Sequence, residues 1–306
     1  MRQFFREIKI KYNILGEKSD LVLGRFFRSL VKVNMNLKDY KVNYHYLSDC
    51  DMNCRFCFRF HSNVNKDKIL STFNELCSKT KSINLVGGEV FLDIPLLKKL
   101  ILIGRSKNIQ MSLVSNGYEL FKSLDSPDVQ VILSNISYLG ISVDSFNASY
   151  NFTIGRCASN DTLTFEKLKT IVDVSKAYGC KVKLNTVVTA LNQNEISKEQ
   201  INTLQVDKWK IFKVVTNQEK LKITDEAFRE FINNNSLPIL KYEDEEILQF
   251  TYLNVDSNGH FILNTRNKKP IVSIFDDISV IEERLEKSAF NKEGYQSRYK
   301  EGDKND

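Results

Sequence analysis

The middle of the chain alternates between two hydrophobic patterns, one typical of strands and one typical of helices. Runs rich in β-branched and aromatic residues predict six strands, at residues 42–47, 83–86, 110–115, 138–144, 182–188 and 208–215. Apolar residues recur at helical spacing in three segments between them, residues 66–79, 94–105 and 165–178. Strands that alternate with helices form right-handed units in which the strands are parallel. The pattern therefore predicts an α/β fold built on a parallel sheet or barrel.

Three cysteines lie close together after the first predicted strand: Cys50, Cys54 and Cys57. Thiolates are the usual protein ligands of iron–sulfur clusters, and a four-iron cluster normally takes four of them. Three ligands leave one iron open to a small molecule. The alternatives are a structural zinc site, which needs a fourth ligand, or a chance group of buried thiols. The three histidines are scattered along the chain, so the spacing favours an iron–sulfur cluster.

Polar residues gather where the predicted strands end, and this end of a parallel sheet usually carries the chemistry. Gly87, Gly88 and Glu89 follow the second strand. The glycines allow a backbone to approach a ligand closely, although a tight turn explains the pair equally well. The candidates on the later strands are Ser115, Asn116, Ser142, Asp144, Lys183, Asn185, Lys208 and Lys210.

The lysines of the last two predicted strands indicate an anion. Lys208 and Lys210 share one face of their strand, because side chains alternate, and Lys183 shares a face with Asn185. Burying a lysine without a partner of opposite charge is costly. A phosphate site is therefore favoured over the alternative that these lysines lie on the surface.

The composition is that of a soluble globular protein, with 42% hydrophobic and 27% charged residues among 306. Its net charge of +6 suits an anionic substrate as well as it suits nucleic acid. No apolar run is long enough to span a membrane, and the N-terminus lacks the apolar core of a signal peptide. Six cysteines, three of them crowded, fit a reducing compartment better than a disulfide framework. We therefore expect a cytoplasmic protein.

Four regions are expected along the chain. Residues 1–38 are a basic extension, in which residues 20–33 predict an amphipathic helix. Such a helix can lie on a membrane surface, but packing of its apolar side on the following domain is the simpler interpretation. Residues 39–220 form the core and residues 221–299 a C-terminal segment that closes the active site. The remaining residues, 300–306, form a disordered tail.

The cysteine spacing, with Phe56 just before the last cysteine, resembles the signature of the radical S-adenosylmethionine (SAM) enzymes. Several further segments extend the resemblance, in order, to viperin-like enzymes of this class, from about residue 41 to about residue 275. These segments are 83–89, 114–117, 141–146, 154–156, 183–185, 209–212 and 251–253. The resemblance implies a partial (βα)6 barrel of the radical SAM type with N- and C-terminal extensions. It also implies two cofactors, a 4Fe–4S cluster and SAM.

The resemblance also implies a role for each candidate residue. The cluster would be held by Cys50, Cys54 and Cys57. SAM would be bound by Phe56, Gly87, Gly88, Glu89, Ser115, Asn116, Ser142, Asp144 and Arg156. The planar fork of Arg156 suits the SAM carboxylate, because it donates two parallel hydrogen bonds. The triphosphate of a nucleotide would be bound by Lys183, Asn185, Lys208 and Lys210.

The implied reaction converts a ribonucleoside triphosphate to its 3′-deoxy-3′,4′-didehydro form through a 5′-deoxyadenosyl radical. Tyr252 is the candidate donor of a hydrogen atom or proton in the last step. The alternative is an ordinary strand aromatic in a hairpin that turns at residues 257–259. We expect residues 221–299 to fold over the mouth of the barrel when nucleotide binds, with Tyr252 reaching the ribose.

The expected partners are the nucleotide and an electron donor such as flavodoxin or ferredoxin. We expect a monomer that binds neither polymeric nucleic acid nor a membrane stably. One alternative is a radical SAM enzyme acting on another anionic substrate, RNA or a peptide. Many of those carry a second cluster, for which Cys77, Cys157 and Cys180 are too dispersed. The other alternative is a membrane-associated scaffold with a structural cluster.

Overall fold

The computed structural model describes residues 35–60, 64–265 and 268–300. The described residues from Asn36 onward form one compact unit. The predicted amphipathic helix over residues 20–33 and the predicted tail over 301–306 lie outside the described residues. None of the helices within the described ranges is long and apolar enough to cross a membrane.

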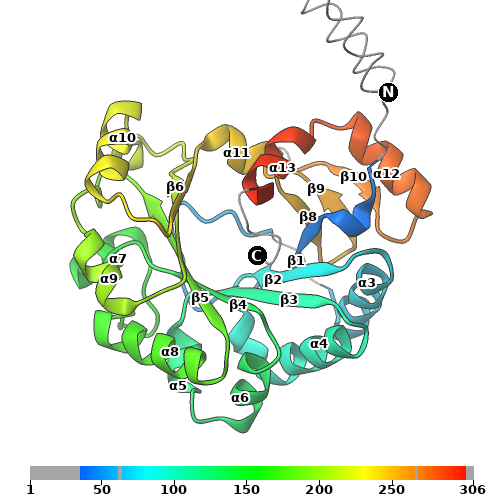
Figure 1. Ribbon diagram of the computed structural model, residues 1–306, viewed down its shortest axis with the longest axis horizontal. Coiled ribbons are helices and arrows are strands. Elements are labelled where there is room, and N and C mark those ends of the chain that lie inside the picture. Colours follow the sequence, from blue (N-terminus) through cyan, green and yellow to red (C-terminus); the bar gives the residue numbers. More distant parts are fainter. Residues whose placement is uncertain (1–34, 61–63, 266–267, 301–306) are drawn as a thin grey trace, which may run out of the picture. The chain divides into compact units, whose positions relative to one another are not determined.

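In the described part of the chain, ten strands form one sheet in the order β10-β9-β8-β1-β2-β3-β4-β5-β6-β7 (Figure 1). Neighbours from β1 to β7 are parallel, and β8 is parallel to β1 on its other side. Strands β9 and β10 continue the sheet in antiparallel fashion. The strands are β1 Lys41–Leu47, β2 Ser82–Gly87, β3 Gln110–Ser115, β4 Tyr138–Ser142, β5 Lys181–Val188, β6 Lys208–Lys213, β7 Leu240–Glu243, β8 Leu253–Asp256, β9 His260–Ile262 and β10 Pro270–Ser273.

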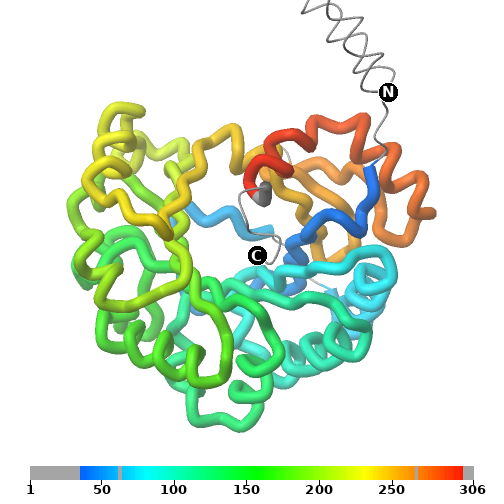
Figure 2. The backbone as a smooth tube through the Cα atoms, viewed as in Figure 1, coloured from blue at the N-terminus to red at the C-terminus, as the bar shows by residue number. Residues whose placement is uncertain are grey.

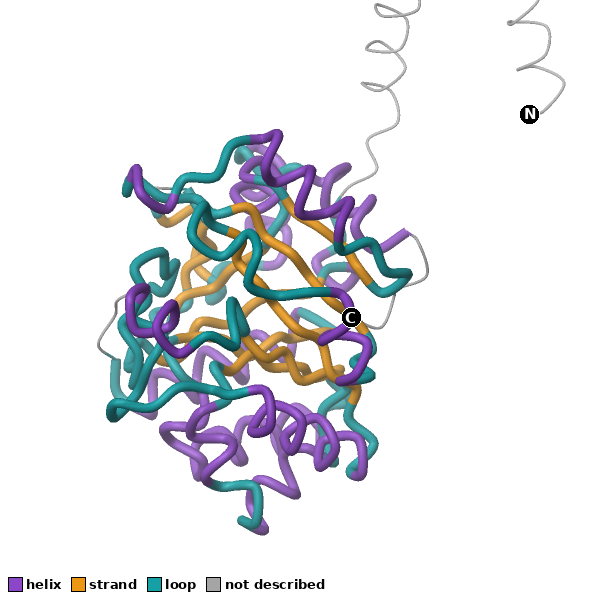
Figure 3. Tube along the Cα trace, turned by 90° about the vertical axis from the view of Figure 1, so that its left-hand side faces the viewer, coloured by secondary structure: helices purple, strands orange, loops and turns teal. Residues whose placement is uncertain are grey.

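Helices follow most of the parallel strands and cover the outer side of the curved sheet, as Figure 3 shows in a second view. Side-chain caps fix several helix starts: Asn65 accepts a hydrogen bond from the Lys68 amide, and Thr164 accepts one from the Lys167 amide. The α-helices are α3 Lys66–Lys79, α4 Ile94–Ser106, α5 Tyr118–Lys122, α6 Pro127–Leu133, α7 Ala148–Ile154, α8 Phe165–Ala177, α9 Lys198–Leu204, α10 Asp225–Asn234, α11 Glu245–Phe250, α12 Ile278–Lys287 and α13 Lys292–Lys300. Short 3-10 helices are η1 Leu37–Asp39, η2 Val90–Asp93 and η3 Glu219–Leu221.

The core lies between the sheet and its helices. On β2, Ile83 and Leu85 are fully buried, and so are Leu97 and Leu100 of α4. This burial of apolar surface is the main source of stability for such a layer. The polar ends of the strands are thereby held on a rigid frame.

The predicted α/β fold of the radical SAM type is confirmed, and the six predicted strands and three predicted helices match with small changes at their ends. The six predicted strands are not the whole parallel part of the sheet, because β7 follows β6 and β8 returns to pair in parallel with β1. Figure 2 shows this return, in which a late segment of the chain lies beside the early strand β1. The predicted hairpin at residues 257–259 is present between β8 and β9, with Gly259 at φ +91°.

Candidate functional site

A cavity of about 660 Å³ lies on the inner side of the curved sheet. Alternate residues of the strands line it, because side chains one residue apart point to opposite faces. Among the described residues in its wall, Glu243 is the one carboxylate, and eight are lysine or arginine. These eight are Lys41, Arg156, Lys183, Lys208, Lys210, Lys213, Lys241 and Arg298. Such an excess of positive charge at a concave, partly enclosed surface favours an anionic ligand.

The predicted triphosphate residues come together in this wall. The strand register places Lys183 opposite Lys208, and Asn185 opposite Lys210. Lys183 and Lys208 are both buried, with 7% of each residue exposed. Gly140, the register neighbour of Lys183 on β4, leaves room for this lysine, because a Cβ there would lie 3.0 Å from the Lys183 Cε atom.

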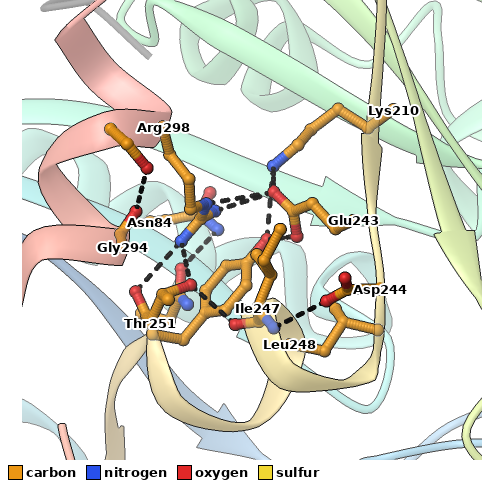
Figure 4. A network of polar contacts seen from close by, with 12 residues as sticks. Asn84, Lys210, Glu243, Asp244, Ile247, Leu248, Thr251, Gly294 and Arg298 are labelled. Carbon is orange, nitrogen blue, oxygen red and sulfur yellow. Dashed lines mark hydrogen bonds and ion pairs between the residues drawn. The ribbon is translucent and has the colours of Figure 1, made fainter. Parts of the chain in front are cut away.

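A buried ionic network lies at the edge of the cavity where β7 ends (Figure 4). The Glu243 carboxylate accepts from Lys210 Nζ at 2.7 Å and from Arg298 Nε at 3.1 Å. It also accepts from the Tyr252 hydroxyl at 2.5 Å. Burial alone would raise the pKa of Glu243, but Arg298 and Lys210 outweigh it and lower the pKa to about 2. Glu243 is therefore a carboxylate at neutral pH.

Tyr252 lies between the two cations of this network. The Arg298 guanidinium stacks on the Tyr252 ring, 3.8 Å from its centroid, and Lys210 Nζ donates to the hydroxyl oxygen at 3.2 Å. Thr251 holds the other side of Arg298, whose Nη1 donates to the Thr251 carbonyl at 3.0 Å. Sequence reasoning found Lys210 and Tyr252 here but missed Glu243 and Arg298.

A chain of side-chain amides crosses the inner face of β8, β1, β2 and β3. The Ser112 hydroxyl donates to Asn84, Asn84 donates to Asn43, and Asn43 donates to Asn254 at 3.1 Å. His45 Nε2 lies 3.2 Å from the same Asn254 oxygen, and burial lowers the pKa of His45 to about 4. The imidazole is thus neutral, and Asn254 accepts from its Nε2–H. Sequence reasoning missed this polar layer, because single asparagines on apolar strands carry no motif.

The cysteine loop is anchored to the rest of the unit by backbone hydrogen bonds on two sides. The Gly88 and Glu89 amides donate to the carbonyls of Leu47 and Asp49, at 2.6 and 2.8 Å. At Gly88 a Cβ would lie 1.8 Å from the Asp49 oxygen, so glycine is required there by the approach of the loop. On the other side the Asn53 amide donates to the Gly155 carbonyl at 3.0 Å.

The three cysteines of this loop are free thiols. Cys50 and Cys54 are half-buried and Cys57 is exposed. Burial raises the pKa of the Cys50 thiol to about 11, and the Met52 amide donates to its sulfur at 3.4 Å. Among the described residues, no three Cys, His, Asp or Glu side chains converge as a metal-ligand set in this arrangement. By their chemistry, three thiols on one anchored loop still fit an iron–sulfur cluster that takes its remaining ligand from elsewhere.

The predicted SAM residues form two groups. The first surrounds Glu89, which is fully buried. Its carboxylate accepts from the Ser115 hydroxyl, from the Asn116 amide and from the Phe91 amide, at 2.7, 2.7 and 3.0 Å. Burial outweighs these donors and raises the pKa of Glu89 to about 7. Asn116 continues the group to the cysteine loop, where its Nδ2 donates to Asp51 at 2.6 Å.

The second group lies on the side of the cavity, where Phe56, Ser142 and Arg156 are part of its wall. Arg156 Nε donates to the carboxylate of Asp144, which is fully buried. The other Asp144 oxygen accepts from the Val187 amide at 2.7 Å. Asp144 thus holds Arg156 in place, and a direct contact of its own with a ligand would compete with these bonds.

Comparisons with known proteins connect this arrangement to one superfamily. The family model of the Radical SAM superfamily matches residues 44–205 of the chain. An S-adenosylmethionine-dependent nucleotide dehydratase from Fibrobacter sp. (strain UWH6) is 29% identical, over 87% of this chain and 89% of the relative. A protein of the same name from Psychrobacter lutiphocae is 26% identical, over 86% of this chain and 95% of the relative. The S-adenosylmethionine-dependent nucleotide dehydratase RSAD2 from Oncorhynchus mykiss is 27% identical, over 84% of this chain and 78% of the relative.

Solved structures share the fold. SuiB from Streptococcus suis superposes with a TM-score of 0.55 at 16% identity, over 97% of this chain and 78% of SuiB. The structure of anSMEcpe with bound AdoMet superposes with a TM-score of 0.56 at 16% sequence identity, over 84% of this chain and 78% of anSMEcpe. The similarity to the dehydratases over most of the chain confirms the predicted resemblance to viperin-like enzymes. With the superfamily match spanning more than half of its length, the chain belongs to the radical SAM superfamily.

Proposed function

We propose that the protein is a radical SAM dehydratase that converts a ribonucleoside triphosphate to its 3′-deoxy-3′,4′-didehydro analogue. The observation that carries this proposal is the pair of buried lysines, Lys183 and Lys208, in a cavity wall rich in cations. Dehydratases of nucleotides are also the curated relatives of the chain. A 4Fe–4S cluster and SAM are the cofactors of the superfamily, and when bound they supply a 5′-deoxyadenosyl radical.

The phosphates are assigned to the lysine side of the cavity. Lys183 and Lys208 are register partners, so their ammonium groups can neutralise one phosphate from two strands. Asn185 and Lys210 form the next pair along the same strands and would contact the neighbouring phosphate. Arg298 from α13 adds a planar fork to this side.

SAM is assigned to the opposite side, next to the cysteine loop. Arg156 would donate to the SAM carboxylate while Asp144 keeps its side chain extended. Ser142 faces the same cavity and would add a hydrogen bond. Gly87, Gly88 and Glu89 would approach the SAM amino group, with Ser115 and Asn116 orienting the glutamate. The cluster would be held by Cys50, Cys54 and Cys57.

Tyr252 is assigned to the last step, as the donor of the proton with which the 3′ hydroxyl of the ribose leaves as water, while an external donor supplies the one electron that completes the double bond. Tyr252 is part of the cavity wall, and its hydroxyl donates to Glu243 and accepts from Lys210. We infer that the C-terminal segment, residues 221–299, excludes water from the site, because α11 and α13 contribute residues to the wall. A one-electron donor such as flavodoxin or ferredoxin would serve the enzyme, which would act as a monomer.

The test is nucleotide-dependent cleavage of SAM. Protein reconstituted anaerobically with iron and sulfide is incubated with SAM, a reductant and CTP, UTP or GTP in turn. We expect about four iron atoms per chain, and formation of 5′-deoxyadenosine and didehydro product with one nucleotide far above the rest. Cys54→Ala should lose the iron, whereas Cys180→Ala, a buried thiol away from the loop, should keep it. Equal 5′-deoxyadenosine with and without every nucleotide would refute the proposed substrate.

A further inference from the structure

Glu243 stands out because it is an acidic residue in a cavity wall that otherwise attracts anions. It is the last residue of β7, and 4% of its surface is exposed. Among the described wall residues it is the one carboxylate beside eight cations. Burying a carboxylate beside a substrate phosphate opposes binding of that phosphate, so its presence needs a function that offsets this cost.

The contacts of Glu243 indicate such a function. Its three partners among the described residues come from separate parts of the chain: Lys210 lies on β6, Arg298 on α13, and Tyr252 just before β8. Both Arg298 side-chain atoms that reach it, Nε and Nη2, lie 3.1 Å from the same oxygen. The second oxygen accepts the Tyr252 hydroxyl at 2.5 Å. One carboxylate therefore fixes two cations and the phenol together.

We propose that Glu243 is a positioning residue that acts as an internal substitute for a substrate phosphate, pairing Lys210 and Arg298 and orienting the Tyr252 hydroxyl. The inference rests on the proposed function, since it takes a polyphosphate as the competing anion. A phosphate that reaches Lys210 and Arg298 must share them with the carboxylate and is repelled by it. Glu243 therefore weakens phosphate binding and in return keeps Tyr252 in a defined place.

Removing the charge of Glu243 should therefore have opposite effects on phosphate binding and on product formation. In Glu243→Gln the repulsion is gone and the two cations are released, so phosphate should bind more tightly, by about tenfold for one charge removed at close range. Tyr252 loses its charged acceptor, so each SAM cleaved should yield less didehydro product. If Glu243 had only a structural role, Glu243→Gln would weaken phosphate binding and product formation alike.

The test uses the full chain and inorganic tripolyphosphate as the probe, measured by titration calorimetry. The variant Glu283→Gln is the matched control, because it makes the same change of charge on an exposed residue of α12 that pairs with Lys287. We expect tripolyphosphate to bind Glu243→Gln about tenfold more tightly than it binds either the wild type or this control. Unchanged or weaker binding to folded Glu243→Gln would overturn the inference.

A second variant covers the case in which Glu243→Gln does not fold. Glu243→Asp keeps the charge but is one methylene shorter, so tripolyphosphate affinity should stay within about threefold while the ratio of product to 5′-deoxyadenosine falls. An unchanged ratio in Glu243→Asp would also overturn the inference. If wild-type protein binds tripolyphosphate but no nucleotide promotes SAM cleavage, the proposed function fails, and the calorimetric comparison still decides the role of Glu243.

Discussion

Replacing Lys183 by methionine should weaken nucleotide binding by about thirtyfold without unfolding the protein. Lys183 lies in the cavity wall with 7% of its surface exposed, so its charge is little screened by water. An ammonium group about 4 Å from a phosphate oxygen attracts it by about 4 kcal/mol at the effective dielectric constant of a protein surface. The water that both groups give up offsets roughly half of this. The remaining 2 kcal/mol or so corresponds to about thirtyfold in Kd.

The assay is titration of the nucleotide into the folded variant, with melting temperature as the check on folding. Lys181→Met is the matched control, because Lys181 begins the same strand and is exposed. Its affinity for nucleotide should stay within about twofold of wild type, since an exposed charge contributes little. If Lys183→Met also bound nucleotide within twofold of wild type, the phosphate assignment and the electrostatic reasoning behind it would both be wrong.

Tyr252→Phe should still form 5′-deoxyadenosine but give a much lower ratio of didehydro product to 5′-deoxyadenosine. An unchanged ratio would mean that Tyr252 only packs in the cavity wall and donates nothing. Asp144→Asn should lower stability by about 3 kcal/mol in chemical denaturation, because it leaves the Arg156 charge buried without its partner, and a loss below about 1 kcal/mol would show that Arg156 is solvated instead. Because the pKa of Glu243 is lowered from 4.5 to about 2, its ionised form should stabilise the fold above pH 4.5. The difference in unfolding free energy between wild type and Glu243→Gln should therefore shrink as the pH falls from about 4.5 toward 2, and a constant difference would contradict the shift.

Much of the fold could be predicted from local patterns. The central parallel strands carry closely spaced buried apolar residues, such as Ile83 and Leu85 of β2, and these patterns are readable without knowledge of the strand partners. Strand β7 was missed because its four residues, Leu240–Glu243, are too few to establish a strand pattern, and of these only Glu243 is buried. Strand β8 was expected only as part of a hairpin, because its pairing with β1 joins segments about two hundred positions apart.

In the site, too, residues within one local pattern could be predicted, whereas residues brought together from distant segments could not. Lysines on one strand face could be identified from the alternation of side chains. By contrast, Arg298 lies on a polar helix near the end of the chain, and no pattern in the sequence ties it to Tyr252. The glycines show a different limit. Gly88 was expected to let a backbone approach a ligand, and in the structure the backbone that approaches it is that of Asp49. The sequence indicates a close approach but does not say what approaches.

The two ends of the parallel part of the sheet explain why the buried ionic network lies where it does. Strand β7 is the edge strand at one end of the parallel part, whereas β8, next to β1, is the last parallel strand at the other end. In the described chain, β7 and β8 form no ladder with each other, and the short helix α11 connects them. Glu243 ends the first strand and Tyr252 immediately precedes the second, so their hydrogen bond joins the two ends by side chains. A backbone ladder there would seal this side of the cavity. The two ends are instead joined by side chains, and an anion that reaches Lys210 and Arg298 there must share them with the Glu243 carboxylate.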